Sequence, residues 1–546
     1  MLVKTLQELT LPEQENLVFV HPEPCEWFSL PAENKSRLQN LPDRTKSRDE
    51  LLAMARNYTR ELAAGPCPGG ACDNIITTGH QPTWHHCGIW AKDLTACKLA
   101  KAVGGTALHL VLDHDICDVG LVLPEKDGAG YWHFRKVEIE PEQHNVLPEL
   151  RPPPGEAQVR AFLEAVVSGH PERFCSDIWP RCGVFANSRP PRFENLAHLV
   201  TYLQYALNSA LGLEMLYLPV SELSESRAFL DFVTSIISEA ADFARSYNDA
   251  VAANSDKRKT KRPKAIGPLA FDKPTGLIEL PFWLISSDGT RTSLCVASKT
   301  PDKIRIGTAS AELGDLDSGQ AAGRADQLND ILKKHGYLVR PKAVSLTLFV
   351  RLFLADLFVH GVGGASYEPV TDYIIERFYK IKPPRFAVAT CTMRLPLAAP
   401  PDSAERDISG LKHKLHRIKH SPEEYIAESA LACEPVASLL QSKKELIAKA
   451  TDPAAPPTVR KTAWNSLSII NDRLYEYAGD AAKVLQREAA QAEKRRASDE
   501  VRTSREFFFG LFAEQRLREL ADSAFFNTRQ AVTSRFAVSD TERRLQ

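Results

Sequence analysis

Two short apolar runs in the first quarter of the chain are each followed at once by polar residues that could do chemistry. Residues 75–78 precede Gly-His-Gln at 79–81, and residues 108–112 precede Asp-His-Asp at 113–115. The first run is rich in β-branched residues and the second is strongly apolar, as in strands of a parallel sheet buried on both faces. Because such sheets bind ligands at the carboxyl ends of their strands, both polar groups are candidate site residues.

The first group, Gly79, His80 and Gln81, suits the binding of an anion. Gly79 permits a sharp turn and Pro82 fits the first turn of a helix, so the sequence predicts that a helix begins here. The free N–H groups and the dipole of a helix start attract negative charge, and His80 and Gln81 would add side-chain donors. The alternative is a capped turn that carries an ordinary surface histidine.

The second group, Asp113, His114 and Asp115, suits acid–base work. In an extended segment the two carboxylates face one way and the histidine the other. One carboxylate could hold a substrate amine while His114 acts as acid or base, and a flanking carboxylate would raise its pKa toward neutrality. Local turn capping by aspartate is the alternative.

A metal site is not predicted. His80, His85, His86 and His114 lie close in the sequence, but adjacent histidines point in different directions. The spacing contains no His-x-x-x-His pair and no cysteine cluster.

A third candidate segment, His-Gly-Val-Gly-Gly-Ala at residues 360–365, follows the apolar stretch 344–359, for which the sequence predicts a helix. Arg351 and Asp356 interrupt that stretch and are expected to be paired or to face its edge. Gly361, Gly363 and Gly364 would let the backbone approach a ligand closely, or they form a helix C-cap and turn. Arg340 and Arg394 lie nearby in the sequence and are candidate anion partners.

These segments resemble motifs of the bacillithiol biosynthesis cysteine-adding enzymes, a family of cysteine ligases. Residues 78–81 (Thr-Gly-His-Gln) are similar to the family's first βα turn. Residues 113–115 are similar to the end of its second strand, although Leu112 stands where the family usually has Glu. Residues 338–341 and 360–365 are similar to its Leu-Arg-Pro and Tyr-Val-Gly-Gly-Pro segments. The motifs occur in the family's order, so the chain is expected to be a distant member.

Composition limits the class of protein. The chain has 546 residues, enough for more than one domain, and is 43% hydrophobic and 25% charged, as globular proteins are. A net charge of -1 indicates neither nucleic acid nor membrane as a partner. No run of about 18 apolar residues or signal-peptide pattern is present. Eleven scattered cysteines, including Cys67 and Cys72, favour reduced thiols and a cytoplasmic location.

The pattern along the chain predicts an α/β fold with four regions. Residues 1–70 are expected to form an N-terminal arm that leads into a helix around residues 48–63. Residues 71–400 are expected to form a Rossmann-like core with insertions at 122–210 and 250–330, and residues 279–283 are expected to form a strand in a second α/β layer. Apolar residues spaced three and four apart, from Ile408 to Ile418 and from Trp464 to Leu485, predict an antiparallel coiled-coil hairpin over residues 401–505. Residues 506–546 are expected to dock on the core. The basic run at 257–264 is a solvated loop or meets an anionic ligand.

The resemblance implies a ligase that joins the carboxylate of cysteine to the amine of a glucosaminyl-malate-like acceptor. Amide formation needs an activated acyl group, which implies ATP or another nucleotide as cofactor. His80, Asp113, His114 and Asp115 would then be catalytic, and the resemblance implies a homodimer formed through the coiled coil. Two alternatives stay open: a non-catalytic nucleotide- or metabolite-binding scaffold, and a metal-dependent hydrolase.

Overall fold

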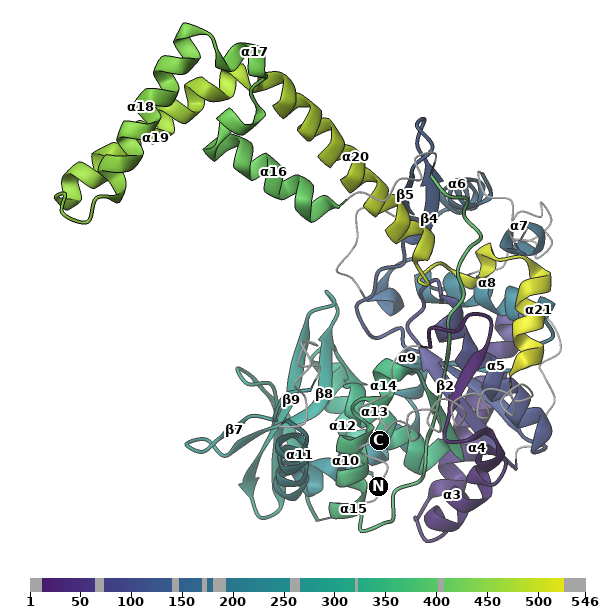
Figure 1. Ribbon diagram of the computed structural model, residues 1–546. Coiled ribbons are helices and arrows are strands. Elements are labelled where there is room, and N and C mark those ends of the chain that lie inside the picture. Colours follow the sequence, from purple (N-terminus) through teal and green to yellow (C-terminus); the bar gives the residue numbers. More distant parts are fainter. Residues whose placement is uncertain are drawn as a thin grey trace, which may run out of the picture. The chain divides into compact units, whose positions relative to one another are not determined.

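The computed structural model describes residues 12–63, 73–139, 147–168, 174–179, 193–255, 266–319, 323–400 and 407–524 (Figure 1). The basic run at 257–264, Cys67 and Cys72 lie outside the described residues. The chain divides into two compact units. The first comprises residues 1–123, 136–395 and 505–546, and the second comprises residues 124–135 and 396–504. The protein is therefore mixed α/β, with a helical region near its C-terminus.

A six-stranded sheet organises the first unit. Its strand order is β1-β14-β13-β2-β3-β6, and every neighbouring pair is parallel except β1 with β14. The strands are β1 (Val18–His21), β2 (Ile75–His80), β3 (Thr106–Val111), β6 (Leu216–Pro219), β13 (Leu357–His360) and β14 (Ala387–Cys391). The chain runs from β2 to β3 and β6 on one side, then returns to β13 and β14 on the other. The strand order therefore reverses between β2 and β13.

The predicted turn after β2 is wrong in detail. β2 continues through Gly79 and His80, which pair with Leu110 and Val111 of β3. A Cβ on Gly79 would lie 2.7 Å from the carbonyl oxygen of Leu110, so this glycine serves close strand packing rather than a turn. Helix α5 begins only at Cys87 and runs to Ala102, which leaves Pro82 in the connecting loop.

The apolar stretch 344–359 is not one helix. It forms α13 (Ala343–Phe349), a π-helical turn (Val350–Leu354) and then β13. The glycines at 361–364 therefore follow a strand and lie at the edge of the sheet formed by the carboxyl ends of its parallel strands. A long apolar run does not by itself distinguish a buried helix from a buried strand.

The two charged residues inside that stretch are paired, as expected. Asp356 accepts hydrogen bonds from Arg44 at 2.8 Å and from Arg48 at 2.9 Å. Arg351 pairs with Glu368 and, at 2.6 Å, with Asp372. Buried charges persist because each has a partner of opposite sign.

A second, antiparallel sheet follows in the chain, with strand order β11-β10-β9-β8-β12. Its strands are β8 (Leu277–Ser286), β9 (Arg291–Thr300), β10 (Lys303–Gly307), β11 (Glu312–Asp317) and β12 (Tyr337–Pro341); β7 (Phe271–Asp272) pairs with β8. Helices α10 (Arg227–Ser238), α11 (Ala240–Ser255) and α12 (Arg324–Lys334) contribute to the same apolar core as strands of both sheets. The predicted strand around residues 279–283 lies in β8.

The segment expected to be an N-terminal arm contributes to the sheet unit itself. It supplies edge strand β1, helix α3 (Leu30–Leu38) and helix α4 (Arg44–Ala63), whose Leu51 and Leu52 are buried in the main core. Short-range pattern marked α4 as a helix, but the pairing of β1 with β14 joins segments more than 360 residues apart.

The C-terminal helical region contains α16 (Ile408–His420), α17 (Glu428–Leu431), α18 (Glu434–Thr451), α19 (Pro457–Tyr477) and α20 (Gly479–Thr503). α18 and α19 lie side by side, and α16 packs along α20 (Figure 1). Leu411, Ile418, Leu474 and Leu485 share one apolar cluster. Two continuous long helices do not form, because Pro422 and Pro435 cannot continue a helix interior. Trp464, expected in the seam, is 57% exposed.

None of the helices in the described part of the chain is both long enough and apolar enough to cross a membrane.

Candidate ligand-binding site

A cavity of about 350 Å³ lies where the strand order reverses, at the carboxyl ends of β2 and β13. We call it the β2–β13 cavity. Open parallel sheets bind ligands at this position. The polar and glycine residues in its wall come from six segments: Gly79, His80 and Gln81; His86, Gly88 and Lys92; Thr347; His360, Gly361, Gly363, Gly364 and Tyr367; Thr390; Arg505 and Glu506.

Six of the residues singled out from the sequence line this cavity: Gly79, His80, Gln81, Gly361, Gly363 and Gly364. The structure thus brings the first and third candidate segments together, although about 280 residues separate them. Asp113, His114, Asp115, Arg340 and Arg394 do not line it.

Lys92 is a cation that sequence reasoning did not select. It lies on α5, is 4% exposed, and donates a hydrogen bond of 2.6 Å from Nζ to the carbonyl oxygen of Gly79. Burial lowers its pKa to about 8, so at pH 7 it is mainly charged. An ammonium group has three N–H donors, which leaves capacity for an anion in the cavity.

Arg505 is the second cation, and it arrives from the far end of the chain. Its Nη2 donates to Oγ1 of Thr390 at 3.3 Å, and its Nε lies 3.7 Å from a carboxylate oxygen of Glu506. A side chain at Gly88 would collide with Arg505 and would lie 2.9 Å from the carbonyl oxygen of Cys391. Gly88 therefore makes room for the guanidinium at the first turn of α5.

An aromatic contact fixes the segment that carries Arg505. Phe509 stacks on Trp90 of α5 with ring centroids 4.8 Å apart, and its backbone N–H donates to the carbonyl oxygen of His85 at 2.9 Å. Phe507, Phe508, Leu511 and Phe512 are also buried. The strongly apolar sequence after Arg505 is the reason why this tail is expected to dock on the core.

The start of α5 is not the open anion site that the sequence predicts. His86 is the N-cap and its Nδ1 accepts from the N–H of Gly88 at 3.0 Å. The N–H groups of Ile89 and Trp90 both donate to the carbonyl oxygen of His86. Burial and nearby Arg505 and Lys92 lower the pKa of His86 to about 3, so it stays neutral. Side-chain cations, rather than free backbone N–H groups, supply the positive charge of the cavity.

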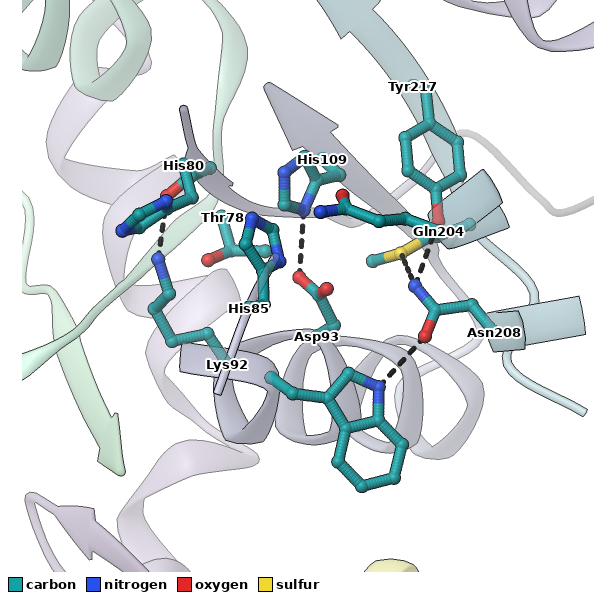
Figure 2. A network of polar contacts seen from close by, with 12 residues as sticks. Thr78, His80, His85, Lys92, Asp93, His109, Gln204, Asn208 and Tyr217 are labelled. Atoms are coloured by element: carbon teal, nitrogen blue, oxygen red, sulfur yellow. Dashed lines mark hydrogen bonds and ion pairs between the residues drawn. The ribbon is translucent and has the colours of Figure 1, made fainter. Parts of the chain in front are cut away.

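A line of buried histidines supports the loop after β2. Figure 2 shows the rings of His80, His85 and His109 in succession, with Asp93 beside His109. His109 Nδ1 lies 2.8 Å from Asp93, and His85 Nε2 lies 3.1 Å from the carbonyl oxygen of Gln81. The pKa of His80 is well below its usual range because of burial and Lys92, and burial lowers that of His85 to about 3. Both histidines are therefore neutral at pH 7.

Hydrogen bonds also join the polar side chains at the inner end of this network. Asn208 accepts from Nε1 of Trp90 at 2.8 Å and donates to the hydroxyl of Tyr217 at 3.0 Å (Figure 2). Burial opposes the ionisation of Asp93, but His109 beside it holds the pKa of that carboxyl below its usual value. Hydrogen-bonded networks of this kind make the segments that they join more rigid, so this network supports the positions of His80 and Gln81 at the cavity.

The aspartates at 113 and 115 meet different partners, contrary to the expectation that they face one way. Asp113 is 1% exposed and accepts hydrogen bonds from the backbone N–H and the hydroxyl of Ser221. Asp115 accepts from Nε2 of Gln81 at 3.2 Å and from Arg291 at 2.9 Å. Asp115 thus touches the cavity wall indirectly, through Gln81, whereas Asp113 supports the segment that follows β6.

Burial shifts the pKa of His114 in the direction opposite to the one expected from the sequence, and it also raises the pKa of Asp113. The pKa of His114 is lowered to about 4 because its desolvation outweighs the attraction of Asp115. The pKa of Asp113 is raised to about 7 by burial and by nearby Glu149. The flanking carboxylate therefore does not bring His114 toward neutrality.

The two arginines proposed as anion partners are engaged elsewhere. Arg340 is 2% exposed and forms a 2.8 Å ion pair with Glu149. Arg394 lies 2.5 Å from Glu15. Their place in the cavity is taken by Lys92 and Arg505. No local sequence pattern around Lys92 and Arg505 predicts that they line the same cavity.

Among the residues that the structure describes, no group of three or more His, Cys, Asp or Glu side chains is arranged to hold a metal ion.

A scan of the chain against models of known protein families gave no match, and a search of curated proteins gave no significant similarity. The resemblance to the cysteine-adding enzymes therefore rests on the short motifs alone.

Proposed function

We propose that the β2–β13 cavity is the active site of a cysteine ligase-like enzyme with a Rossmann-like core. The strand order β6-β3-β2-β13-β14 corresponds to the 3-2-1-4-5 order of the dinucleotide-binding folds, which hold their ligands at the reversal point. The β2–β13 cavity lies at the point where the strand order reverses.

One observation carries the proposal: two cations and a glycine segment share a single cavity. Lys92 and Arg505 supply positive charge, and Gly361, Gly363 and Gly364 leave space for a ligand to approach the backbone. Lysine and arginine in a partly dry site bind carboxylates and phosphates strongly. A substrate carboxylate or a nucleotide phosphate fits this surrounding.

The motif resemblance supplies the reaction. A nucleoside triphosphate such as ATP would activate the carboxylate of cysteine, and the amine of a glucosaminyl-malate-like acceptor would displace the activating group. A cavity of about 350 Å³ lies at the lower end of the range for small-molecule sites. It suits cysteine with its activated group better than a complete large acceptor.

The test is a direct assay with ATP, cysteine and glucosaminyl malate, followed by mass spectrometry of the product. Lys92→Gln should abolish formation of the cysteinyl amide. Lys101→Gln, on the exposed face of the same helix, should leave it unchanged. Failure of the wild-type protein to form a cysteinyl amide with any amino-sugar acceptor would refute the ligase proposal.

The second candidate is a non-catalytic nucleotide- or metabolite-binding protein. The observation that favours it is the placement of Asp113 and His114, which do not line the cavity and are buried among other groups. Calorimetry separates the two: saturable binding of ATP or cysteine without product would favour this candidate.

The proposal includes a homodimer in the cytoplasm, formed through the helical unit. The α18–α19 pair would act as a short antiparallel coiled-coil hairpin, as the motif resemblance implies for this region.

A further inference from the structure

The buried carboxylate of Glu368 lies beside His360, which is the last residue of β13 and lines the cavity. Nε2 of His360 lies 3.1 Å from Oε1 of Glu368, and the two side chains are 4% and 0% exposed. The other carboxylate oxygen of Glu368 is paired with Arg351, which also holds Asp372 at 2.6 Å. Arg351 therefore holds Glu368 in place, and the Glu368 carboxylate lies against the Nε2 side of the imidazole ring.

The carboxylate beside Nε2 favours one tautomer of this ring. A carboxylate attracts an N–H proton and repels a nitrogen lone pair, so a neutral His360 is favoured with its proton on Nε2. Nδ1 then carries a lone pair. It lies 2.9 Å from the position that a Cβ on Gly364 would take, and Gly364 lines the cavity. The glycine leaves open the space beside the unprotonated nitrogen.

Burial and three charged groups control the charge of this histidine. Burial lowers the pKa of His360 more than Glu368 of α15 (Glu368–Arg377) raises it, and Arg351 and Lys92 lower it further. Burial opposes the ionisation of Glu368, but His360 and Arg351 hold its pKa below the usual range. Tyr367 beside Gly364 stays protonated, because burial and Glu368 raise its pKa. At pH 7 the pair is a neutral imidazole backed by an anionic carboxylate.

We propose that His360 is the general base of the β2–β13 cavity and that Glu368 is its positioning residue, so that the second substrate of the site is a primary amine. This inference rests on the proposed ligase function. Nδ1 of His360 takes a proton from the amine nitrogen as that nitrogen attacks the activated acyl carbon of cysteine. The new C–N bond forms and the C–O bond to the nucleotide-derived leaving group breaks. The leaving group departs with the electron pair as phosphate or nucleoside monophosphate.

The experiment compares two nucleophiles with the full-length protein, ATP and cysteine. Hydroxylamine is already a neutral, strong nucleophile and needs little base assistance, whereas the sugar amine needs a base. His360→Gln should keep hydroxamate formation near the wild-type rate and slow amide formation by about 10²-fold or more. The wild-type amide rate should rise with pH through the lowered pKa of His360, and the variant should lose that rise.

Two matched controls isolate the pair. Glu368→Gln should slow amide formation and move the pH profile, because an amide side chain can donate to Nε2 and reverse the tautomer. Glu376→Gln on the exposed face of α15 and the exposed His335→Gln should do neither. Thermal melting of each variant checks that it folds.

The outcomes separate the two proposals. If His360→Gln forms the amide at the wild-type rate, the base assignment is overturned and the ligase function stands. If wild-type protein forms neither hydroxamate nor amide, the ligase function fails and the base assignment fails with it. Nitrogen-15 NMR of histidine gives a readout that needs no turnover: a proton on Nδ1 of His360, or a protonated ring at pH 7, overturns the assignment by itself.

Discussion

At the scale of single residues, the electrostatics of the cavity depend on how burial competes with pairing. Lys92 gains one hydrogen bond, to the carbonyl of Gly79, and loses most of its hydration. Its lowered pKa of about 8 places a change of charge just above neutral pH. Histidines 80, 85 and 86 are neutral at pH 7, so the positive charge at this pH comes from Lys92 and Arg505.

Binding of an anion should therefore weaken as pH rises through about 8. Lys92 is charged below that pH and neutral above it, so the affinity for ATP measured by calorimetry should fall about tenfold between pH 7 and pH 9. Lys92→Arg should bind with little pH dependence, since arginine stays protonated. Lys101→Gln should keep the wild-type profile. A wild-type affinity that is constant over this range would show that Lys92 does not hold the anion.

Asp113 should make the protein less stable as pH rises. Its pKa is about 7 in the folded chain and about 3.9 when unfolded. Between these values the unfolded state has lost a proton that the folded state retains, so the free energy of unfolding falls with increasing pH. Asp113→Asn can keep both contacts to Ser221. It should remove a loss of unfolding free energy on the order of 3 kcal/mol between pH 4 and pH 7.

Urea denaturation at several pH values measures this effect. Asp231→Asn, at an exposed position of α10, is the control and should reproduce the wild-type slope. Equal slopes for wild-type and Asp113→Asn proteins would contradict the raised pKa.

At the scale of elements, the segment after α20 completes the cavity. It carries Arg505 and Glu506 into the wall and is held by the stacking of Phe509 on Trp90. Such a short segment has no regular structure of its own to keep it in place, apart from one turn at 509–511. Its position therefore depends on buried aromatic area.

Phe509→Ala should reduce both stability and ligand binding. Loss of a buried phenylalanine costs about 3 kcal/mol or more, and the freed segment would no longer hold Arg505 beside Gly88. Calorimetric unfolding and ATP binding measure the two effects. Phe28→Ala, at a side chain that is 50% exposed, should change neither by more than about 0.5 kcal/mol. Unchanged ATP affinity in Phe509→Ala would separate the segment from the site.

At the scale of the whole molecule, the helical unit presents large apolar side chains to solvent. Trp464 is 57% exposed and Ile469 is 58% exposed on α19. Single exposed apolar residues are common. Two large ones on α19, the helix that packs against α18, offer contact area for a second copy of the chain.

We expect light scattering at micromolar concentration to give twice the chain mass. The double substitution Trp464→Ser and Ile469→Ser should give the monomer mass, whereas Phe271→Ser in the sheet unit should not. A wild-type monomer that persists at high concentration would contradict the proposed dimer.

The sequence by itself determined the local elements whose pattern repeats within a few residues. β2, β3, α4 and the C-terminal helices were readable because burial imposes a period of two or 3.6 on neighbouring side chains. The choice of Gly79–Gln81 and of Gly361–Gly364 followed from where strands end, and the structure brings these two segments to one cavity.

Tertiary structure alone decided which charges face that cavity. Lys92, Arg505 and the pair of His360 with Glu368 come from four segments, and no local pattern links a cation at residue 92 with another at 505. Asp113, Arg340 and Arg394 were equally good candidates for the site from the sequence, but in the fold each pairs with another residue away from the cavity. A charged side chain binds a ligand only where folding leaves it incompletely paired, and that depends on contacts between residues hundreds of positions apart.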